Sequence, residues 1–358
     1  MSVLELSVLD LLRVMEEQRA SDIYLKAGSP PMYRVDGEVR PAPHQVLSPA
    51  DVARLAGQMM SDQDQQRLAR DSSVDLAYSA SGVGRFRVNI YRQRGSMAIV
   101  ARRVRQDVPT LGELHLPAVL SDLAMAPRGL ILVTGPAGSG KSTTLAAMID
   151  RRNEASRNHI VTIEDPIEFL HADKMGIVSQ REVSTDTPGF HEALRAALRQ
   201  TPDVLLIGEM RDRESAEAAL YFAETGHLIL STLHSLNAAQ AVERLLAFFP
   251  PDHTQEVFHR LSLTIAGIIA QRLIPRSDAT GRIAALEVLT ATPRIRELVK
   301  RGDIDGIKEA LQAGRQEGMQ TFDQALYDLA KAAFITEADA LRYADSTNDL
   351  KLRFKGLA

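Results

Sequence analysis

The sequence predicts an α/β protein of two domains, in which a small α+β domain precedes a doubly wound parallel sheet that ends in helices. Short segments with alternating apolar and polar residues fill the first part of the chain, as in strands with one buried face. From Gly129 onward, unbroken apolar runs are separated by helical stretches, as in a parallel sheet covered on both faces. The length of 358 residues also exceeds what one ordinary hydrophobic core supports.

The first domain is expected to span residues 1–105 and to begin with a helix. The segment MSVLELSVLDLLRVMEEQ has apolar residues at helical spacing, and its acidic residues and lack of a basic start exclude a secretory signal. In GRFRVNIY, the side chains of Phe86, Val88 and Ile90 fall on one face, which predicts a half-buried strand. The turn QRGS and the segment MAIVARRV then predict the returning strand of a hairpin.

A linker is expected over residues 106–118, because this stretch contains two prolines and little periodicity. The second domain would then span residues 119–358. Its buried parallel strands are predicted at GLILVT (129–134), HIVTI (159–163), DVLLIG (203–208) and HLILST (227–232). From about Ala238 the chain is expected to be helical, including the segment TQEVFHRLSLTIAGIIAQRL (254–273).

The overall charge and the lack of cysteine exclude several classes of function. A formal charge of −4 provides no general attraction to polyanions, so nucleic acid is not an expected partner. The absence of cysteine excludes disulfides, thiolate zinc sites and a cysteine nucleophile, and it is compatible with a reducing compartment. The longest apolar stretch is too short to cross a bilayer, so a cytoplasmic protein is expected.

A phosphate-binding loop is predicted by GPAGSGKSTT, which matches the pattern G-x-x-x-x-G-K-[ST] between an expected strand and an expected helix. The backbone N–H groups of such a loop cradle the phosphates of ATP, the lysine reaches the β- and γ-phosphates, and the serine hydroxyl ligates Mg²⁺. The nucleotide-binding residues predicted here are Gly135, Pro136, Ala137, Gly138, Ser139, Gly140, Lys141, Ser142 and Thr143. Ser142 is also the first predicted ligand of Mg²⁺.

Carboxylates follow two of the predicted strands, at the sheet edge where doubly wound folds bind ligands. Glu209 ends DVLLIGE, and Glu164, Asp165 and Glu168 lie in HIVTIEDPIEF. Glu209 can hold the shell of Mg²⁺ through water, and a second carboxylate can orient or deprotonate an attacking water. The alternative is that these acids only cap the helices that follow, which applies more to Glu164 and Asp165 than to the other two.

Two further features are candidates for sensing or stabilising phosphate charge. His234 lies just beyond the strand at 227–232, at the same sheet edge as the phosphate loop, and could contact the γ-phosphate rather than serve in the core. In the first domain, at least one of Arg85, Arg87, Arg102 and Arg103 could pair with the phosphates of ATP bound by another domain or subunit. A solvated strand face and a nucleic-acid surface are the alternatives for these arginines, and few aromatic residues accompany them.

In combination, several segments resemble the type IV pilus retraction ATPases, the PilT and PilU group of the secretion-ATPase superfamily. They are GPAGSGKSTTLAAMID, TIEDPIEF, ALRQTPDVLLIGEMRD, AETGHLILSTLHS and GMQTFDQAL, together with the early SDIYLKAGSPPMYRVDGEV. The resemblance implies a PAS-like first domain, a RecA-like second domain and a homo-hexameric Mg²⁺-dependent ATPase. It also implies that Glu168 is the catalytic base and that Glu209 is the Walker B residue.

The resemblance further implies a cytoplasmic motor that acts on the pilus machinery at the inner membrane. The helix expected at RIRELVKR (294–301) departs in part from the retraction motif AIRNLIRE, and the C-terminal region looks more like PilU. A paralogous retraction ATPase is therefore a further candidate partner. Two alternatives stay open, namely a RecA-type motor driven by nucleic acid and a scaffold that binds ATP without hydrolysing it.

Overall fold

The computed structural model describes residues 6–357, and the chain divides into two compact units between Gln106 and Asp107. The fold class expected from the sequence is confirmed, because each unit combines helices with its own sheet. Residues 107–118 count with the second unit, where Leu111 and Leu116 pack against the core. No helix within residues 6–357 is long and apolar enough to cross a membrane.

The first unit is a six-stranded antiparallel sheet packed against helices. The order of its strands is β3-β2-β1-β6-β5-β4. The strands are β1 (Asp22–Lys26), β2 (Met32–Val35), β3 (Glu38–Pro41), β4 (Ser73–Ala80), β5 (Gly84–Gln93) and β6 (Ser96–Arg103), and the helices are α1 (Val8–Glu17), α2 (Pro49–Met59) and α3 (Asp62–Asp71). The predicted hairpin is confirmed as β5 and β6, and Phe86, Val88 and Ile90 are buried as expected. Residues 1–5 of the expected first helix lie outside the described residues.

The second unit is built on a seven-stranded sheet whose order is β13-β12-β7-β11-β10-β8-β9. Its strands are β7 (Gly129–Thr134), β8 (His159–Glu164), β9 (Ile177–Glu182), β10 (Val204–Ile207), β11 (Leu228–Leu233), β12 (Ile265–Pro275) and β13 (Arg282–Thr290). Strands β8, β10, β11 and β7 are paired in parallel without a register shift, and they are the four strands predicted from apolar runs. The carboxyl ends of these strands therefore lie at one edge of the sheet.

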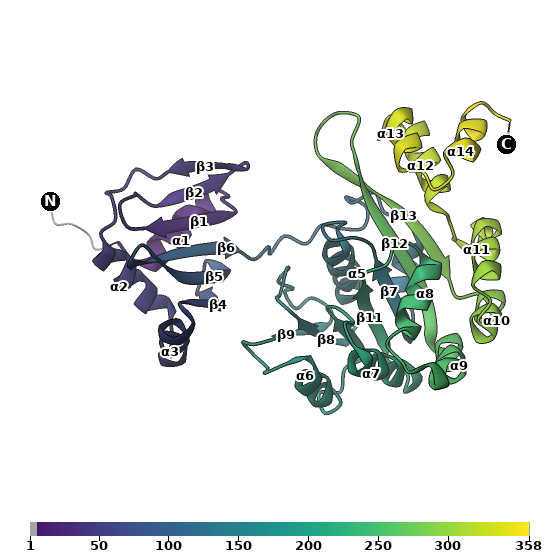
Figure 1. Ribbon diagram of the computed structural model, residues 1–358, viewed down its shortest axis with the longest axis horizontal. Helices are drawn as coiled ribbons and strands as arrows, with labels where there is room; N and C mark the ends of the chain where they lie inside the picture. Colours follow the sequence, from purple (N-terminus) through teal and green to yellow (C-terminus); the bar gives the residue numbers. More distant parts are fainter. Residues whose placement is uncertain (1–5, 358) are drawn as a thin grey trace. The chain divides into compact units, whose positions relative to one another are not determined.

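Helices cover both faces of this sheet, as Figure 1 shows for α5 and α8 on opposite sides of β7. Leu130 and Leu132 of β7 belong to one apolar core, and the alternate residues Ile131 and Val133 belong to another. The helices up to the sheet's last hairpin are α4 (Val119–Ala124), α5 (Lys141–Ala155), α6 (Phe190–Ala197), α7 (Arg213–Glu224), α8 (Ala238–Leu246) and α9 (Thr254–Thr264). Burial on both faces explains why these strands appear in the sequence as unbroken apolar runs.

The expectation of a continuous helix over 254–273 is wrong. Helix α9 ends at Thr264, and the chain continues directly into strand β12, which pairs with β7 and with β13. The β-branched residues Ile265, Ile268 and Ile269 favour a strand. Since β12 is also buried on both faces, its sequence lacks the alternation that distinguishes a strand from a buried helix.

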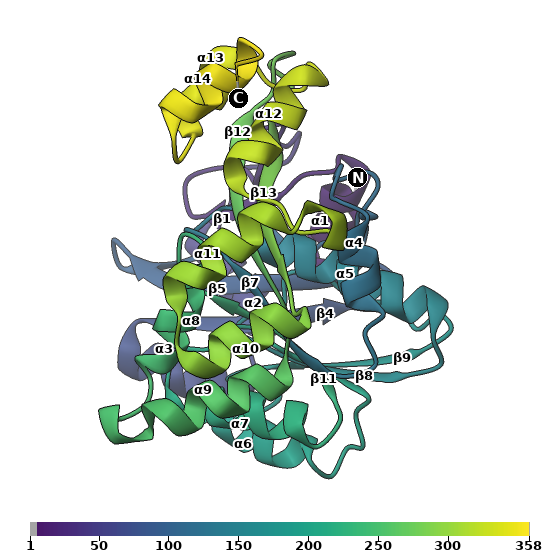
Figure 2. The same ribbon diagram turned by 90° about the vertical axis from the view of Figure 1, so that its right-hand side faces the viewer.

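The C-terminal helices follow the β12–β13 hairpin, and Figure 2 shows α10, α11 and α12 succeeding one another along it. They are α10 (Pro293–Arg301), α11 (Ile304–Ala313), α12 (Phe322–Lys331), α13 (Glu337–Tyr343) and α14 (Thr347–Phe354). In α10, the guanidinium of Arg296 donates to the carbonyl oxygens of Ser262 and Leu263, at 2.8 and 2.9 Å. Arg296 therefore satisfies carbonyl groups in the last turn of α9 and helps to pack α10 against α9.

Glu287 of β13 is a carboxylate buried inside the second unit. Its Oε1 accepts the backbone N–H of Ala238 at 2.7 Å, at the first residue of α8. Burial raises the pKa of Glu287 to about 7, and the nearby carboxylates of Asp345 and Asp323 add to this effect while Arg272 opposes it. The folded protein therefore holds a proton on Glu287 over a pH range in which the unfolded chain has released it.

The raised pKa of Glu287 predicts that the second unit loses stability as the pH rises from about 4.5 to about 7. The contribution of Glu287 is fully present below the lower value, because both states are then protonated. Glu287→Gln keeps an acceptor for Ala238 and carries no titrating proton. We expect the free energy of unfolding of this variant to depend less on pH than that of the wild type. At pH 8, urea titrations should give a free energy of unfolding about 1–3 kcal/mol higher than that of the wild type. The exposed Glu337→Gln is the control, and an equal pH dependence in Glu287→Gln and the wild type would contradict the assignment.

Candidate active site

The phosphate-binding loop joins the end of β7 to the start of α5, as the sequence predicted. Gly140 stands at the N-cap of α5 with a φ of +90°, a conformation that glycine adopts without strain. The side chain of Lys141 folds back over the loop, where Nζ donates to the carbonyl oxygens of Gly135 and Pro136 at 2.8 and 3.0 Å. Burial lowers the pKa of Lys141, and the negative charge of Glu209 opposes this shift.

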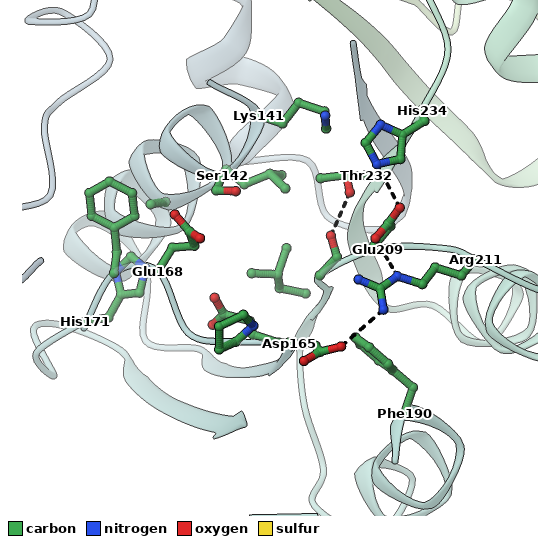
Figure 3. Close-up of a pocket in the computed structure, with 17 residues that line it drawn as sticks. Lys141, Ser142, Asp165, Glu168, His171, Phe190, Glu209, Arg211, Thr232 and His234 are labelled. Carbon is green, nitrogen blue, oxygen red and sulfur yellow. Dashed lines mark hydrogen bonds and ion pairs between the residues drawn. The ribbon is translucent and has the colours of Figure 1, made fainter. Parts of the chain in front are cut away.

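A pocket of about 220 Å³ lies beside this loop, at the carboxyl edge of the sheet (Figure 3). Side chains from α5 and from the segments that follow β8, β10 and β11 meet there. The polar and charged residues that line the pocket are Lys141, Ser142, Glu164, Asp165, Glu168, His171, Glu209, Arg211, Thr232 and His234. The structure therefore brings the predicted residues Lys141, Ser142, Glu168, Glu209 and His234 to one cavity.

Glu209 lies between two cationic or protonatable partners on one side of the pocket. Its Oε1 is 2.9 Å from Nε2 of His234, and its Oε2 accepts from Nε of Arg211 at 2.6 Å. The same guanidinium contacts Asp165 Oδ2 at 3.1 Å. The hydrogen bond to Glu209 is the largest of the effects that raise the pKa of Arg211. The guanidinium of Arg211 is therefore positively charged. Figure 3 shows this chain of contacts from His234 to Asp165.

Glu164 and Glu168 have different surroundings although they lie on one short segment. Glu164 is held by Thr162 Oγ1 at 2.7 Å and by Gln180 Nε2 at 3.1 Å. Burial raises the pKa of Glu164, and these two hydrogen bonds oppose the shift. In Figure 3, Glu168 lies next to Ser142 and across the pocket from Glu209. Glu168 therefore lies beside the phosphate loop, whereas Glu164 is fixed by its contacts with β8 and β9.

The segment that carries Glu168 is fastened to α5 by Asn153, which is fully buried. Asn153 Nδ2 donates to the carbonyl oxygen of Ala172 at 2.8 Å, and its backbone oxygen accepts from the N–H groups of Met175 and Gly176 at 3.0 Å each. Lys174 adds ion pairs to Asp150 and Glu154 of the same helix. Burial of the ammonium lowers the pKa of Lys174, but the two carboxylates together raise it by more, so the net shift is upward. The loop after β8 and the P-loop helix therefore form one connected support.

The four predicted arginines lie on the sheet of the first unit. Cross-strand pairing aligns Arg34, Asp22, Arg102 and Arg87 over four neighbouring strands. Asp22 is buried, and its carboxylate is 2.7 Å from Nε of Arg102 and 3.4 Å from Nε of Arg34. Arg103 pairs with Glu16 of α1 at 2.6 Å, and Arg85 Nη1 is 3.5 Å from the hydroxyl of Ser79. Arg85, Arg102 and Arg103 thus have contacts within their own unit that fix their side chains on the sheet.

The residues at the pocket fit Mg²⁺ bound together with a nucleotide rather than in a protein cage. Within residues 6–357, no three histidine or carboxylate side chains gather as a metal ion would require. Mg²⁺ commonly takes only one or two protein ligands and completes its octahedron with phosphates and water. Ser142 at the start of α5 and Glu209 on the same pocket supply a donor set of that kind.

Sequence reasoning missed Arg211 and His171. Arg211 stands two residues after Glu209, and this nearby carboxylate is the one local feature of the sequence that points to a role for Arg211 at the site. Burial lowers the pKa of His171 to about 4, so this side chain is neutral at pH 7 and forms an uncharged part of the pocket wall. Both assignments depend on contacts between segments, which motif spacing does not reveal.

A family model described as Type II/IV secretion system protein matches residues 2–342. The chain belongs to this family. It is 47% identical to the Type IV pilus ATPase PilU of Pseudomonas aeruginosa, over 96% of this chain and 90% of that protein. It is 43% identical to the Type IV pilus retraction ATPase PilT of the same organism, over 94% of this chain and 97% of that protein. The resemblance to the PilT and PilU group is therefore confirmed.

Among solved structures, the fold is similar to the pilus retraction motor PilT with bound ADP. The TM-score is 0.88 with 42% sequence identity, and the match covers 97% of this chain and 99% of that one. The ATPase DotB of Legionella pneumophila is also similar, with a TM-score of 0.79, 27% identity and coverage of 97% and 95%. These matches confirm an α/β fold with a small first domain and a core ATPase-type domain.

The anchoring of the Glu168 segment predicts that Asn153→Ala loosens residues 165–176 while α5 stays folded. The change removes the donor to the carbonyl of Ala172 and the acceptor of the backbone N–H of Lys174, at a cost of about 1–3 kcal/mol for each group left unsatisfied. Hydrogen–deuterium exchange should therefore become faster in this segment. Asn89→Ala, which removes an exposed pair with Asp75 in the first unit, is the control. Unchanged exchange over 165–176 would show that Asn153 is not the anchor.

Proposed function

We propose that this chain is an ATPase that hydrolyses ATP to ADP and phosphate and thereby powers retraction of type IV pili. The observation that carries the proposal is the convergence of Lys141, Ser142, Glu168, Glu209 and His234 on one pocket beside a P-loop. The similarity to PilU and PilT, including a PilT structure with bound ADP, supports the same conclusion.

In this proposal the residues of the pocket divide the chemistry between them. The backbone N–H groups of residues 135–143 bind the phosphates, and Lys141 exchanges its two carbonyl partners for phosphate oxygens. Glu168 accepts a proton from the attacking water, or orients that water toward the γ-phosphate. Ser142 and Glu209 would hold Mg²⁺, the latter through water. When bound, Mg²⁺ neutralises charge on the phosphates and fixes their orientation.

His234 would report the presence of the γ-phosphate. It is now paired with Glu209 at 2.9 Å, and it follows β11 directly, only four residues before α8. A γ-phosphate offers His234 an alternative partner, so binding of ATP would weaken its contact with Glu209. Arg211 keeps Glu209 and Asp165 in place during this exchange, because it contacts both carboxylates. The movement of His234 would then pass to α8.

We also propose that the active form is a homo-hexamer in which arginines of one subunit neutralise charge at the nucleotide of another. The candidates are Arg85, Arg87, Arg102 and Arg103, which lie on the neighbouring strands β5 and β6 of the first unit. Loss of Arg102 would also affect the buried Asp22, with which it pairs. The protein would work in the cytoplasm at the inner membrane, on the pilus machinery and together with a paralogous retraction ATPase.

Two other functions would leave different signatures. A motor of the RecA type driven by nucleic acid would hydrolyse ATP faster when single-stranded DNA or RNA is added, whereas a pilus motor would not. A nucleotide-gated scaffold would bind ATP without turnover. The surroundings of Glu168 favour hydrolysis over the scaffold, because this carboxylate lies beside the phosphate loop and its segment is anchored by a buried asparagine.

Glu168→Gln should preserve nucleotide affinity and lower the turnover of ATP by about 10²- to 10⁴-fold, because a positioned base is lost while the shape is kept. Phosphate release and binding of a fluorescent nucleotide measure the two quantities. The exposed Glu309→Gln serves as the control. If Glu168→Gln turns over normally and Glu209→Gln does not, the proposed roles of the two residues are exchanged.

Mixed rings test the action of Arg87 in trans. Lys141→Ala subunits and Arg87→Ala subunits should each be inactive alone, but a mixture should recover ATPase activity. In mixed rings some intact P-loops face an intact Arg87. The double variant Lys141→Ala/Arg87→Ala mixed with Arg87→Ala contains no such interface and should stay inactive. A lack of recovery at every mixing ratio would contradict the shared site.

A further inference from the structure

The buried side chain of Gln271 joins two parts of the phosphate-binding loop. Its Nε2 donates to the carbonyl oxygen of Ser139 at 2.7 Å, and its Oε1 accepts from the hydroxyl of Thr144 at 2.7 Å. Ser139 lies in the loop itself, and Thr144 lies in the first turn of α5. All three residues are at most 3% exposed, so water does not compete for these bonds. The amide of Gln271 therefore fixes the loop relative to the helix that it opens.

Gln271 also packs closely against two glycines of the P-loop. Strand β12 runs parallel to β7, with Ala270 opposite Thr134, so Gln271 comes level with the start of the loop. A Cβ added to Gly135 would lie 2.5 Å from the backbone oxygen of Gln271, and one added to Gly140 would lie 2.8 Å from Nε2 of its side chain. Two glycines of the motif thus leave space for Gln271 as well as for phosphate.

The next residue of β12, Arg272, is held by the C-terminal helices. Its guanidinium lies 3.8 Å above the ring of Phe322, the first residue of α12. It also donates to the carbonyl oxygen of Tyr343 at 3.0 Å and pairs with Asp345 at 2.7 Å. Tyr343 ends α13, and Asp345 lies in the connection to α14. One side chain thus connects the strand to three parts of the C-terminal region.

The alternation of a β-strand places these two contacts on opposite faces of one sheet. Ala270 and Ile274 belong to the apolar cluster of the C-terminal helices, so Arg272 between them faces the same way. Gln271 and Leu273 face the P-loop, where Leu273 would contact a Cβ at Gly140. Gln271 and Arg272 are adjacent in the backbone, so a displacement of one moves the other.

We infer that Gln271 is a positioning residue for the nucleotide loop, and that the Gln271–Arg272 pair couples this loop to helices α12 and α13. Arg272 fixes the position of β12 relative to the C-terminal helices. Gln271, the preceding residue, fixes the loop in its phosphate-binding conformation. Occupation of the loop by nucleotide should in turn steady these helices, because coupling between two sites is reciprocal. This inference rests on the proposed function in so far as the loop binds nucleotide.

The first test compares ADP affinity in matched variants of the full chain. Gln271→Met keeps the size of the side chain but removes both hydrogen bonds, and it should weaken binding of a fluorescent ADP analogue by about tenfold. Gln271→Glu should also weaken binding, because its carboxylate cannot donate to Ser139. Gln320→Met is the control, since it removes a side-chain bond to the neighbouring β13 without contact to the loop. Equal affinity in Gln271→Met and Gln320→Met would overturn the positioning role.

The second test measures the coupling by hydrogen–deuterium exchange with and without ADP. ADP should slow exchange in residues 322–343 of the wild type and of Gln320→Met, but not in Gln271→Met at saturating ADP. Arg272→Met touches no residue of the loop, yet it should weaken ADP binding in the same direction. An ADP-bound wild type without protection of α12 and α13, or normal ADP affinity in Arg272→Met, would overturn the coupling. A wild type that does not bind ADP at all would overturn the proposed function, and this inference with it.

Discussion

The in-register parallel pairing of β7, β11, β10 and β8 is the constraint on which the candidate site depends. Thr134 pairs with Leu233, and Ile207 pairs with both Ser231 and Ile163, so the four strands end within two residues of one another. The P-loop, Glu168, Glu209 and His234 follow these ends from four distant parts of the chain. The hydroxyl of Thr232 also donates to the carbonyl of Gly208 at 2.7 Å, which fixes the Glu209 segment beside β11. The pocket is therefore a direct result of strand register.

Strand β12 extends this arrangement from the nucleotide pocket to the C-terminal helices. Its buried residues belong to three cores: Ile265 and Ile268 to the core of α8 and α9, Ile269 to that of α5, and Ala270 and Ile274 to that of α12. Of its polar residues, Gln271 contacts the P-loop and Arg272 contacts the C-terminal helices. Buried polar groups are costly unless they are satisfied, and both side chains have several partners here. Glu287 on the neighbouring β13 accepts the backbone N–H of Ala238 at the start of α8. Ala238 lies four residues after His234 in the chain. The hairpin thus contacts the P-loop, the starts of α5 and α8, and the C-terminal helices.

The sequence predicts those parts of the structure whose signals are local. The P-loop is recognisable because its glycines, Lys141 and Ser142 have fixed spacing, and the four central strands because burial on both faces leaves long apolar runs. The same burial made β12 look like a continuation of α9. Edge strand β9 has too few apolar residues to show a pattern. Gln271 lies 132 residues beyond Ser139, so its contact depends on tertiary packing that no spacing rule contains.

The central claim is that this pocket hydrolyses ATP, and phosphate release by Lys141→Ala tests it most directly. The wild type should release phosphate from ATP in the presence of Mg²⁺. Lys141→Ala should release almost none, because a charge-assisted contact to the phosphates is lost. Lys308→Ala, which removes an exposed ammonium paired with Asp305, should match the wild type. Equal rates for Lys141→Ala and the wild type, with both variants folded, would contradict the account.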